Sequence, residues 1–345
     1  MICREKENPV IRKENIPAYC DNAKVIGTFN AGAATMGEET VLVVRVAEKA
    51  IQREGGITAL IFDESTKKIV PRFFPFGQIS DTNDQRSFYV GEKQYLTSIS
   101  HLQVARSKDG VHFKIDNYPF MIPENEYEAF GIEDARISYI GGHYYITYSA
   151  TSCRGTVVGL AMTDDFSSVK RVGILFQPDN KDTVLFNDKI NGKYYALHRP
   201  SSSAFAKPGM WLAESPDLRC FGMHRFVAGV RPGKWDCARI GAGAPPFMTE
   251  KGWVEFYHGA TEQNRYCMGV MLLDKNQPWK VLARSEYPLI EPEYPYELDG
   301  FFGNVIFGCG ATLKNGFVNL YYGASDESVA MVSMTVQDIY HHLDV

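Results

Sequence analysis

An aromatic strand behind a turn glycine reads Gly142-His143-Tyr144-Tyr145-Ile146-Thr147-Tyr148-Ser149. The same pattern of a glycine, an aromatic-rich strand and polar residues at the strand end returns at residues 192–199, 252–259 and 316–323, with a less similar copy at 38–45. Units of β-forming residues that recur at intervals of about 50 to 65 residues are typical of a radial repeat such as a β-propeller. The strand ends of such a repeat meet at one central pocket, so the residues that end each copy are candidates for a single site.

A second type of strand lies between these copies. It is apolar, is usually closed by an Asp-containing turn, and occurs at residues 101–110, 157–165, 210–217, 266–274 and 329–334. Strand, polar tip, strand, Asp turn and strand make up the meander of one propeller blade. We therefore expect an all-β chain in which residues 1–345 form a single five-bladed β-propeller catalytic domain, with short terminal extensions and a central active-site pocket.

Few segments depart from this pattern. Residues 336–343 have the spacing of a short amphipathic helix. Residues 71–90 and 286–304 are long and aperiodic and hold Gly, Pro and aromatic side chains, so we expect loops that form lids or walls of the pocket.

The composition excludes several classes of partner. The formal net charge of -5 argues against nucleic acid or an anionic membrane as the main partner. A small anion remains compatible, because clustered Arg, Lys and His can make one cavity positive inside an acidic protein. The first seven residues are charged and lack the apolar core of a secretory signal, and no run approaches the length of a membrane span, so we expect a cytoplasmic protein. A homo-oligomer is left open.

The seven cysteines are odd in number and scattered, which fits neither a disulfide framework nor a zinc site. We expect no metal and no organic cofactor.

Two adjacent carboxylates and an arginine lie in Phe130-Gly131-Ile132-Glu133-Asp134-Ala135-Arg136-Ile137, just before the second copy. A surface turn with a salt bridge is one interpretation. Alternation along a strand would instead place Asp134 and Arg136 on the same side, facing the pocket. A carboxylic acid held among apolar residues can have its pKa raised enough to donate a proton to a departing sugar oxygen. Asp134 is thus the candidate catalytic acid, and Arg136 a candidate substrate ligand.

Basic residues end several of the repeated strands: Arg45, His198, Arg199 and His258. Arg239 lies at a strand entrance equivalent to that of Asp134. Each residue alone is more simply a surface cation or a buried histidine. Several repeats that deliver a cation to the same end of the array predict a site for an oxyanion, above all phosphate. The glycines from Gly241 to Gly243 would let the backbone approach such a ligand.

Six strings resemble, in order and spacing, the motifs of glycoside hydrolase family 130: residues 29–33, 131–137, 197–200, 239–246, 257–259 and 322–326. That family comprises inverting β-mannoside phosphorylases and a smaller branch of β-1,2-mannosidases. The resemblance spans residues 30 to 326 and implies a five-bladed propeller with the sugar bound at one end of its axis.

The resemblance also implies roles for single residues. Asp134 matches the general acid, which acts through a hydroxyl of the bound mannose, and Asn30, Arg45 and Asp326 match residues that hold this mannose. Arg136, His198 and Arg199 complete our predicted substrate-binding set. Lys181, Arg239 and His258 match phosphate ligands. Ala135 departs from the family pattern, since many members have Pro there.

Two reactions remain to be separated. An inverting hydrolase needs a second carboxylate to activate water, and Glu255 and Glu262 are the nearest candidates. A phosphorylase instead needs cations for its anionic nucleophile. We therefore expect an inverting phosphorylase that converts β-linked, by resemblance β-1,2-linked, manno-oligosaccharides into α-mannose 1-phosphate and a shortened sugar. A β-1,2-mannosidase, a phosphorylase of β-1,4-mannosyl-glucose or β-1,4-mannosyl-N-acetylglucosamine, and a non-catalytic carbohydrate-binding propeller are the alternatives.

Overall fold

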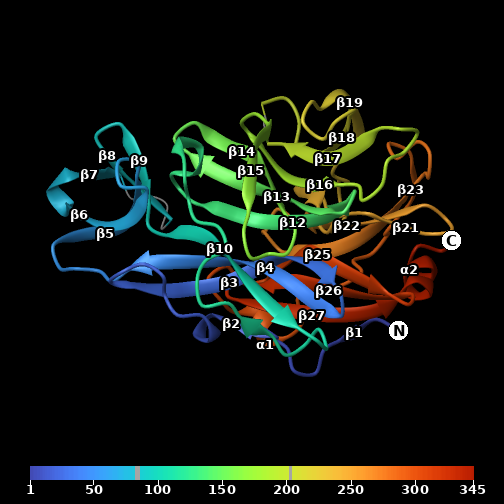
Figure 1. Cartoon of the computed structure of the whole chain (residues 1–345), viewed down its shortest axis with the longest axis horizontal. Helices are drawn as coiled ribbons and strands as arrows, with labels where there is room; N and C mark the ends of the chain where they lie inside the picture. The colour runs from blue at the N-terminus through green and yellow to red at the C-terminus, as the bar shows by residue number, and fades with distance from the viewer. Residues whose placement is uncertain (82–85, 202–203) are drawn as a thin grey trace.

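The computed structural model describes residues 1–81, 86–201 and 204–345. Most of these residues form antiparallel sheets, which confirms the all-β prediction (Figure 1). Sheet 1 contains β3 (Ala23–Met36), β4 (Glu39–Ala50), β10 (Ile99–Ser107) and β11 (Lys114–Ile115). Sheet 2 contains β12 (Ile132–Ile140), β13 (His143–Ser152), β14 (Gly155–Thr163) and β15 (Lys170–Phe176). Sheet 3 contains β16 (Asn180–Leu185), β17 (Tyr194–Pro200), β18 (Met210–Ser215) and β19 (Gly222–Ala228).

Two further sheets complete this set. Sheet 4 contains β20 (Arg239–Ala242), β22 (Trp253–Ala260), β23 (Tyr266–Leu273) and β24 (Val281–Arg284), and β21 (Phe247–Met248) also pairs with β22. Sheet 5 contains β25 (Ile306–Lys314), β26 (Phe317–Ala324) and β27 (Ser328–Thr335). Two strands from the start of the chain, β1 (Cys3–Arg4) and β2 (Ile11–Arg12), pair with β27. The repeated aromatic strands are thus the second strand of each sheet.

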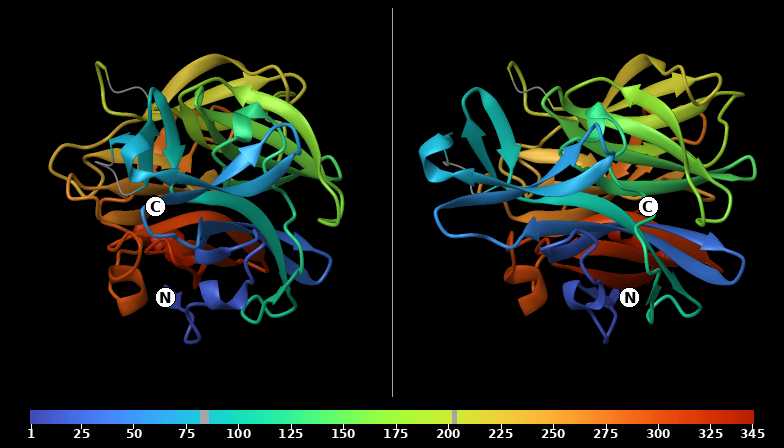
Figure 2. Two further views of the ribbon diagram at one scale, coloured as in Figure 1. Left: turned by 90° about the vertical axis from the view of Figure 1, so that its left-hand side faces the viewer. Right: turned by 60° about the vertical axis from the view of Figure 1, so that its left-hand side comes forward.

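The sheets contact one another in chain order. β3 packs against β12, β12 against β16, and β16 against β20. β25 contacts both β22 and β3, so sheet 5 adjoins sheet 4 on one side and sheet 1 on the other. Figure 2 shows the N-terminal and C-terminal strands lying side by side in two further views. The buried apolar residues lie largely between neighbouring sheets, as in the cluster that joins sheets 4 and 5.

An insertion between β4 and β10 forms two small sheets that project to one side in Figure 1. One contains β5 (Gly56–Asp63) and β6 (Lys68–Pro75), and the other contains β7 (Ile79–Asp81), β8 (Ser87–Val90) and β9 (Lys93–Leu96). The prediction of a loop at 71–90 is therefore wrong for its described part. Phe74 and Phe88 are buried with Tyr95 in a small core of the insertion, and β-sheet pairing satisfies the backbone.

Helices are short. α2 (Val336–His342) confirms the helix predicted near the C-terminus, and Thr335 caps it by accepting a hydrogen bond from the Asp338 backbone N–H. α1 (Pro295–Leu298) is a single turn within the long segment that precedes β25. No helix among the described residues is long and apolar enough to cross a membrane. All seven cysteines are free thiols.

Three sheets contain a buried cluster of the same composition. A carboxylate that precedes the first strand accepts hydrogen bonds from a tyrosine on the second strand and from an arginine on the outermost strand. We call these the Tyr–carboxylate–Arg clusters. Their members are Glu128, Tyr148 and Arg171 in sheet 2; Asp236, Tyr257 and Arg284 in sheet 4; and Glu297, Tyr322 and Arg4 in sheet 5. Each cluster ties the segment that enters a sheet to the rest of that sheet.

Sheet 3 has a histidine at the position of this tyrosine. His198 on β17 bonds through Nε2 to Nδ1 of His224 on β19 at 3.0 Å, and its Nδ1 lies 3.0 Å from Nδ2 of Asn180. Its ring also stacks on Phe176, with centroids 4.3 Å apart. The two histidines therefore take the place of the tyrosine and arginine of the other sheets.

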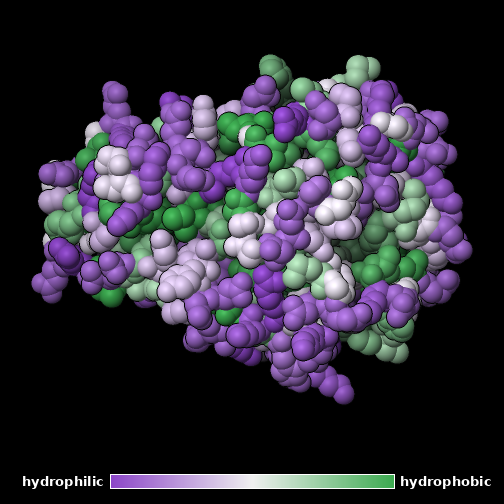
Figure 3. Space-filling model, in the orientation of Figure 1, coloured by the Kyte–Doolittle hydropathy of each residue, from purple (hydrophilic) through white to green (hydrophobic). Residues whose placement is uncertain are grey.

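The outer surface is mixed in character. In the orientation of Figure 1, the space-filling view shows mostly hydrophilic residues with smaller hydrophobic areas between them (Figure 3). Exposed aromatic residues such as Tyr118 and Phe205 are spread over different elements.

Candidate functional site

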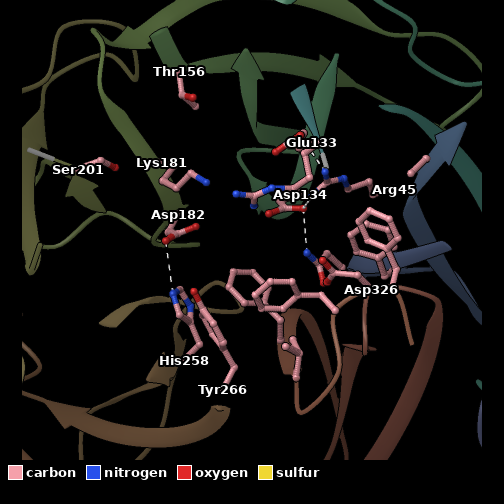
Figure 4. A pocket seen from close by; sticks show the side chains of 18 of the residues that line it. Arg45, Glu133, Asp134, Thr156, Lys181, Asp182, Ser201, His258, Tyr266 and Asp326 are labelled. Atoms are coloured by element: carbon pink, nitrogen blue, oxygen red, sulfur yellow. Dashed lines mark hydrogen bonds and ion pairs between the residues drawn. The ribbon is translucent and has the colours of Figure 1, made fainter. Parts of the chain in front are cut away.

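A cavity of about 740 Å³ is lined by residues from all five sheets and from the β5–β9 insertion. Its walls also include Phe301 and Phe302, from the segment that precedes β25. Parts of both long aperiodic segments thus reach the pocket, although one of them is largely β-structure. Figure 4 shows the polar side chains pointing into this space from different sheets.

The first strands of three sheets carry a β-bulge at the pocket. The pairing shifts by one residue between Phe29 and Gly32, between Glu133 and Arg136, and between Lys181 and Val184. The extra residue in each bulge is Asn30, Asp134 or Asp182, with φ of 49°, 53° and 52°. Asn and Asp tolerate this left-handed conformation better than most residues, and a bulge re-aims side chains. Two successive side chains of each strand consequently line the pocket instead of one.

One group of side chains in the pocket is acidic and centres on Arg45. Its Nη1 donates to Oδ1 of Asp134 at 3.0 Å, and its Nη2 donates to Oε1 of Glu133 at 2.8 Å. Nδ2 of Asn30 also donates to Oδ1 of Asp134, at 3.0 Å. Asp326, in the turn after β26, completes this group (Figure 4).

The pKa values of the two aspartates in this group are displaced in opposite directions. Burial alone would raise the pKa of Asp134, but the charges of Arg45, Arg136 and Lys181 and the Asn30 hydrogen bond outweigh it and lower this pKa. Burial raises the pKa of Asp326 to about 6, helped by the charges of Asp134 and Glu133. The expectation of a raised pKa at Asp134 is therefore wrong for the substrate-free pocket, because its surroundings are cationic and not apolar.

A second group is built around Asp182. Its Oδ2 lies 3.0 Å from Nη2 of Arg199 and 3.5 Å from Nε2 of His258, and its Oδ1 accepts from Arg136 at 3.2 Å. Burial opposes the charge of Asp182, yet these neighbours hold its pKa well below the ordinary value. Lys181 extends into the space between the two groups (Figure 4).

The remaining members of the second group differ in charge. Burial lowers the pKa of His258 to about 3 despite the nearby charge of Asp182, so this imidazole is neutral at neutral pH. The prediction that His258 is a cation is therefore wrong. Arg239 is exposed, lines the pocket and donates to the hydroxyl of Tyr266 at 2.6 Å. Nε of Arg199 and Nδ1 of His258 are buried without a partner among the described residues.

Two predicted ligands lie outside the pocket. Arg136 is 1% exposed and lies beneath the pocket, where it donates to the backbone oxygens of Asp134 and Gly243 and to Asp182. The bulge at Asp134 breaks the alternation from which we placed both side chains on one face. His198 is buried in the histidine pair of sheet 3, and burial lowers its pKa to about 3, so it is not a cation of the pocket.

Gly241 on β20 has a different use from the one expected. A Cβ on Gly241 would lie 2.5 Å from both Oδ2 of Asp182 and Cε1 of His258. The space at Gly241 is therefore filled by these two side chains, which it allows to approach each other, and not by backbone contact with a ligand.

Eight of the ten predicted site residues line the pocket: Asn30, Arg45, Asp134, Lys181, Arg199, Arg239, His258 and Asp326. Several other lining residues had no predicted role: Glu133, Thr156, Asp182, Ser201, Tyr266 and Phe307. One sequence pattern could have identified Asp182. In both Glu133-Asp134-Ala135 and Lys181-Asp182-Thr183, a charged residue is followed by Asp and then by a small residue. Among the described residues, no group of three or more His, Cys, Asp or Glu side chains could hold a metal ion.

Comparison with known proteins identifies the class. Residues 85–344 match the glycoside hydrolase family 130 model, which is described as β-1,4-mannooligosaccharide phosphorylase. The chain is 44% identical to a β-1,2-mannobiose phosphorylase of Listeria innocua over 100% of this chain and 99% of the relative. The chain therefore belongs to glycoside hydrolase family 130, as its motifs predicted.

Two other comparisons agree. A β-1,4-mannooligosaccharide phosphorylase of Ruminococcus albus is 36% identical, with 70% of this chain and 76% of the relative covered. The solved structure of a β-1,2-mannobiose phosphorylase from Listeria innocua, in complex with β-1,2-mannobiose, superposes with a TM-score of 0.94 at 43% identity, covering 99% of both chains.

Proposed function

We propose that the protein is an inverting β-mannoside phosphorylase, which transfers the mannosyl unit of a β-1,2-linked manno-oligosaccharide to phosphate. The observation that carries this proposal is the division of one pocket into a carboxylate group around Arg45 and a basic group around Asp182. Carboxylates and amides suit sugar hydroxyls, whereas arginine and lysine suit a phosphate oxyanion. The β-1,2 linkage is supported by the relative that is 44% identical over the full chain.

We infer that the five sheets are the blades of a propeller that forms one domain. Contacts between consecutive sheets, and between the last and the first, support a closed ring. The pairing of β1 and β2 with β27 would close it, because it joins the two ends of the chain in one sheet. In this arrangement, the bulged first strands face the axis and the pocket lies at one end of it.

In the proposed reaction, phosphate binds among Lys181, Arg199, Arg239 and the neutral imidazole of His258. A phosphate oxygen attacks the anomeric carbon, and the bond to the leaving sugar breaks on the opposite face, which inverts β to α. Arg45, Asn30 and Asp326 hold the mannosyl unit. The cations act by position and charge, so the nucleophile needs no base.

The leaving oxygen must gain a proton, and Asp134 is the proposed source through a mannose hydroxyl. The low pKa of Asp134 belongs to the substrate-free pocket. Phosphate bound beside Lys181 adds negative charge near this carboxylate and offsets the cations that lower its pKa, so the pKa rises toward the range that general acid catalysis requires.

The alternative reaction, hydrolysis, needs a base that activates water, and three described carboxylates that were considered for this role do not suit it. Glu255 is fully buried and does not line the pocket, and Glu262 is exposed and pairs with Lys207. Asp182 lines the basic group, but its charge is already neutralised by Arg136 and Arg199. These contacts favour phosphorolysis, which needs no cofactor. A reaction that keeps its product as a charged sugar phosphate also fits a cytoplasmic location.

Product analysis tests the proposal directly. The protein is incubated with β-1,2-mannobiose, with and without phosphate, and we expect α-mannose 1-phosphate and mannose only when phosphate is present. Given α-mannose 1-phosphate and mannose, it should build β-mannosides and release phosphate, because the two bonds exchanged are of similar energy. Free mannose produced equally without phosphate would indicate a hydrolase, and no turnover would indicate a binding protein.

A further inference from the structure

Arg45 is held by a full set of partners. Its Nε donates to Oγ of Ser100 at 3.0 Å, its Nη1 to Asp134 and its Nη2 to Glu133. The guanidinium also lies over the ring of Phe29, 4.6 Å from its centroid. A planar fork with every nitrogen engaged cannot rotate, so its position depends on each partner.

Glu133 is the charged partner of Arg45 that has no place in the reaction proposed above. It lies one residue before Asp134, and in a regular strand the two side chains would point to opposite faces. The bulge brings both to the pocket, where Arg45 bridges them. About a fifth of each side chain of the Arg45–Glu133 pair is exposed, so water screens this ion pair only in part.

Glu133 also affects the charge balance of the pocket. Glu133, Asp134 and Asp326 all face Arg45, so three carboxylates share one guanidinium. The other charged groups that act on the two aspartates include Arg136 from β12, Lys181 from β16 and Arg86 from the segment before β8. The negative charge of Glu133 therefore offsets part of the positive potential that Arg45 creates at the two aspartates. It also repels the charge of Asp326.

We propose that Glu133 is a positioning residue, which acts through Arg45 to hold the carboxylate of Asp134 in place and to set how much of the Arg45 charge reaches Asp134 and Asp326. This inference rests on the proposed function, because its consequence is a change in sugar binding and proton transfer during phosphorolysis. Glu133 does not contact the reacting atoms in this role.

Three variants separate charge from geometry. Glu133→Gln keeps the length of the side chain and an oxygen for Arg45 but removes the charge. Both aspartates then lose protons more readily, so the pH profile of kcat/KM for β-1,2-mannobiose should move to lower pH by about 0.5 to 1 unit. Glu133→Asp keeps the charge but shortens the reach, so kcat should fall while the profile stays in place. Glu133→Ala should raise the sugar KM and leave the phosphate KM unchanged.

Glu38→Gln is the matched control, because Glu38 is an exposed carboxylate that is paired with Lys314 and does not line the pocket, and it should leave the profile unchanged. Circular dichroism of each variant checks that it is folded. An unshifted profile in a folded Glu133→Gln protein would overturn the inference while leaving the proposed function intact. If the wild-type protein released no mannose 1-phosphate, the proposed function itself would fail.

Discussion

Single residues of this pocket are held in conformations that few residue types adopt. Asn30, Asp134 and Asp182 each occupy the left-handed region within a strand, and Asp326 does so in a turn, with φ of 55°. Such positions cost stability unless the surroundings over-determine them. Here the surroundings are hydrogen bonds and ion pairs that join one sheet to another, such as that between Asn30 and Asp134. Short polar side chains are therefore the residues tolerated at these positions, and all four line the pocket.

Asp134→Asn should retain the bulge, because Asn also tolerates positive φ, and should retain an oxygen for Arg45. Loss of the proton donor should lower kcat by about 10²- to 10⁴-fold with little change in sugar affinity. Steady-state kinetics and isothermal titration with β-1,2-mannobiose measure the two effects. Asp164→Asn, at an exposed turn, is the control. Near-normal turnover by Asp134→Asn would remove this residue from the mechanism.

Arg239→Ala should chiefly weaken phosphate binding. A charge-assisted hydrogen bond contributes about 1.5 to 3 kcal/mol, so the phosphate KM should rise by about 10- to 100-fold while the sugar KM stays constant. Arg219→Ala removes an exposed arginine outside this pocket and should change neither constant. A rise in the sugar KM alone would move Arg239 to the sugar side of the site.

The raised pKa of Asp326 should make the free energy of unfolding decrease as the pH rises. Its pKa is raised from 3.8 to about 6 by burial, so between these values the folded state binds more protons than the unfolded state. The free energy of unfolding then decreases from about pH 4 to pH 6 and stays lower above pH 6. Asp326→Asn should remove this loss and be more stable than the wild type at pH 7 by about 1 to 3 kcal/mol, discounted for partial exposure. Urea unfolding at pH 4 and pH 7 measures the difference, and equal stability of the two proteins at pH 7 would contradict it.

At the scale of elements, each sheet must bring the start of its first strand to the pocket. The Tyr–carboxylate–Arg clusters do this in three sheets by anchoring the preceding segment to the second and the outermost strand. Their carboxylates are at most 1% exposed. A buried carboxylate that lacked its arginine would be strongly destabilising, so the three partners must be retained together.

Asp236→Ala tests this anchoring. The change leaves Arg231, Arg284 and the Tyr257 hydroxyl without their common acceptor, so the free energy of unfolding should fall by about 3 to 5 kcal/mol. Tyr257→Phe removes two hydrogen bonds from the same cluster, the one donated to Asp236 and the one accepted from Arg284, and should cost about 2 kcal/mol. Thermal denaturation of both proteins gives the comparison. A loss at Asp236 no larger than at an exposed pair such as Lys314 and Glu38 would show that the cluster does not anchor the sheet.

At the scale of the whole molecule, the two ends of the described chain meet. β1 and β2 pair with β27, the amino group of Met1 pairs with Asp338 of α2, and Arg4 binds Glu297. The pocket draws side chains from all five sheets, so its geometry depends on how every sheet is held. A change at this junction should therefore affect the site without touching a pocket residue.

Deletion of residues 1–12 should test the junction. It removes two strands of sheet 5 and leaves Glu297 buried without Arg4, so stability should fall by about 3 kcal/mol or more and activity should be lost at a lower temperature. Deletion of residues 1 and 2 alone keeps Arg4 and is the control. An unchanged melting temperature after the longer deletion would show that β1 and β2 do not hold sheet 5 in place.

The all-β class, the repeated second strands, the family and most of the pocket cations could be predicted from the sequence, because strand periodicity and motif order are local properties of the chain. Arg45, Arg199 and His258 end repeated strands, so their shared location follows from the repeat. The bulges could not be predicted, since they depend on pairing with the neighbouring strand. For this reason Arg136 was misplaced and Glu133 received no role. The protonation of Asp134, Asp326 and His258 was likewise decided by the tertiary structure, because burial and charges from several sheets act on each group together. His198 occupies a tyrosine position in its sheet and not the pocket, because its partners Asn180 and His224 lie on two other strands.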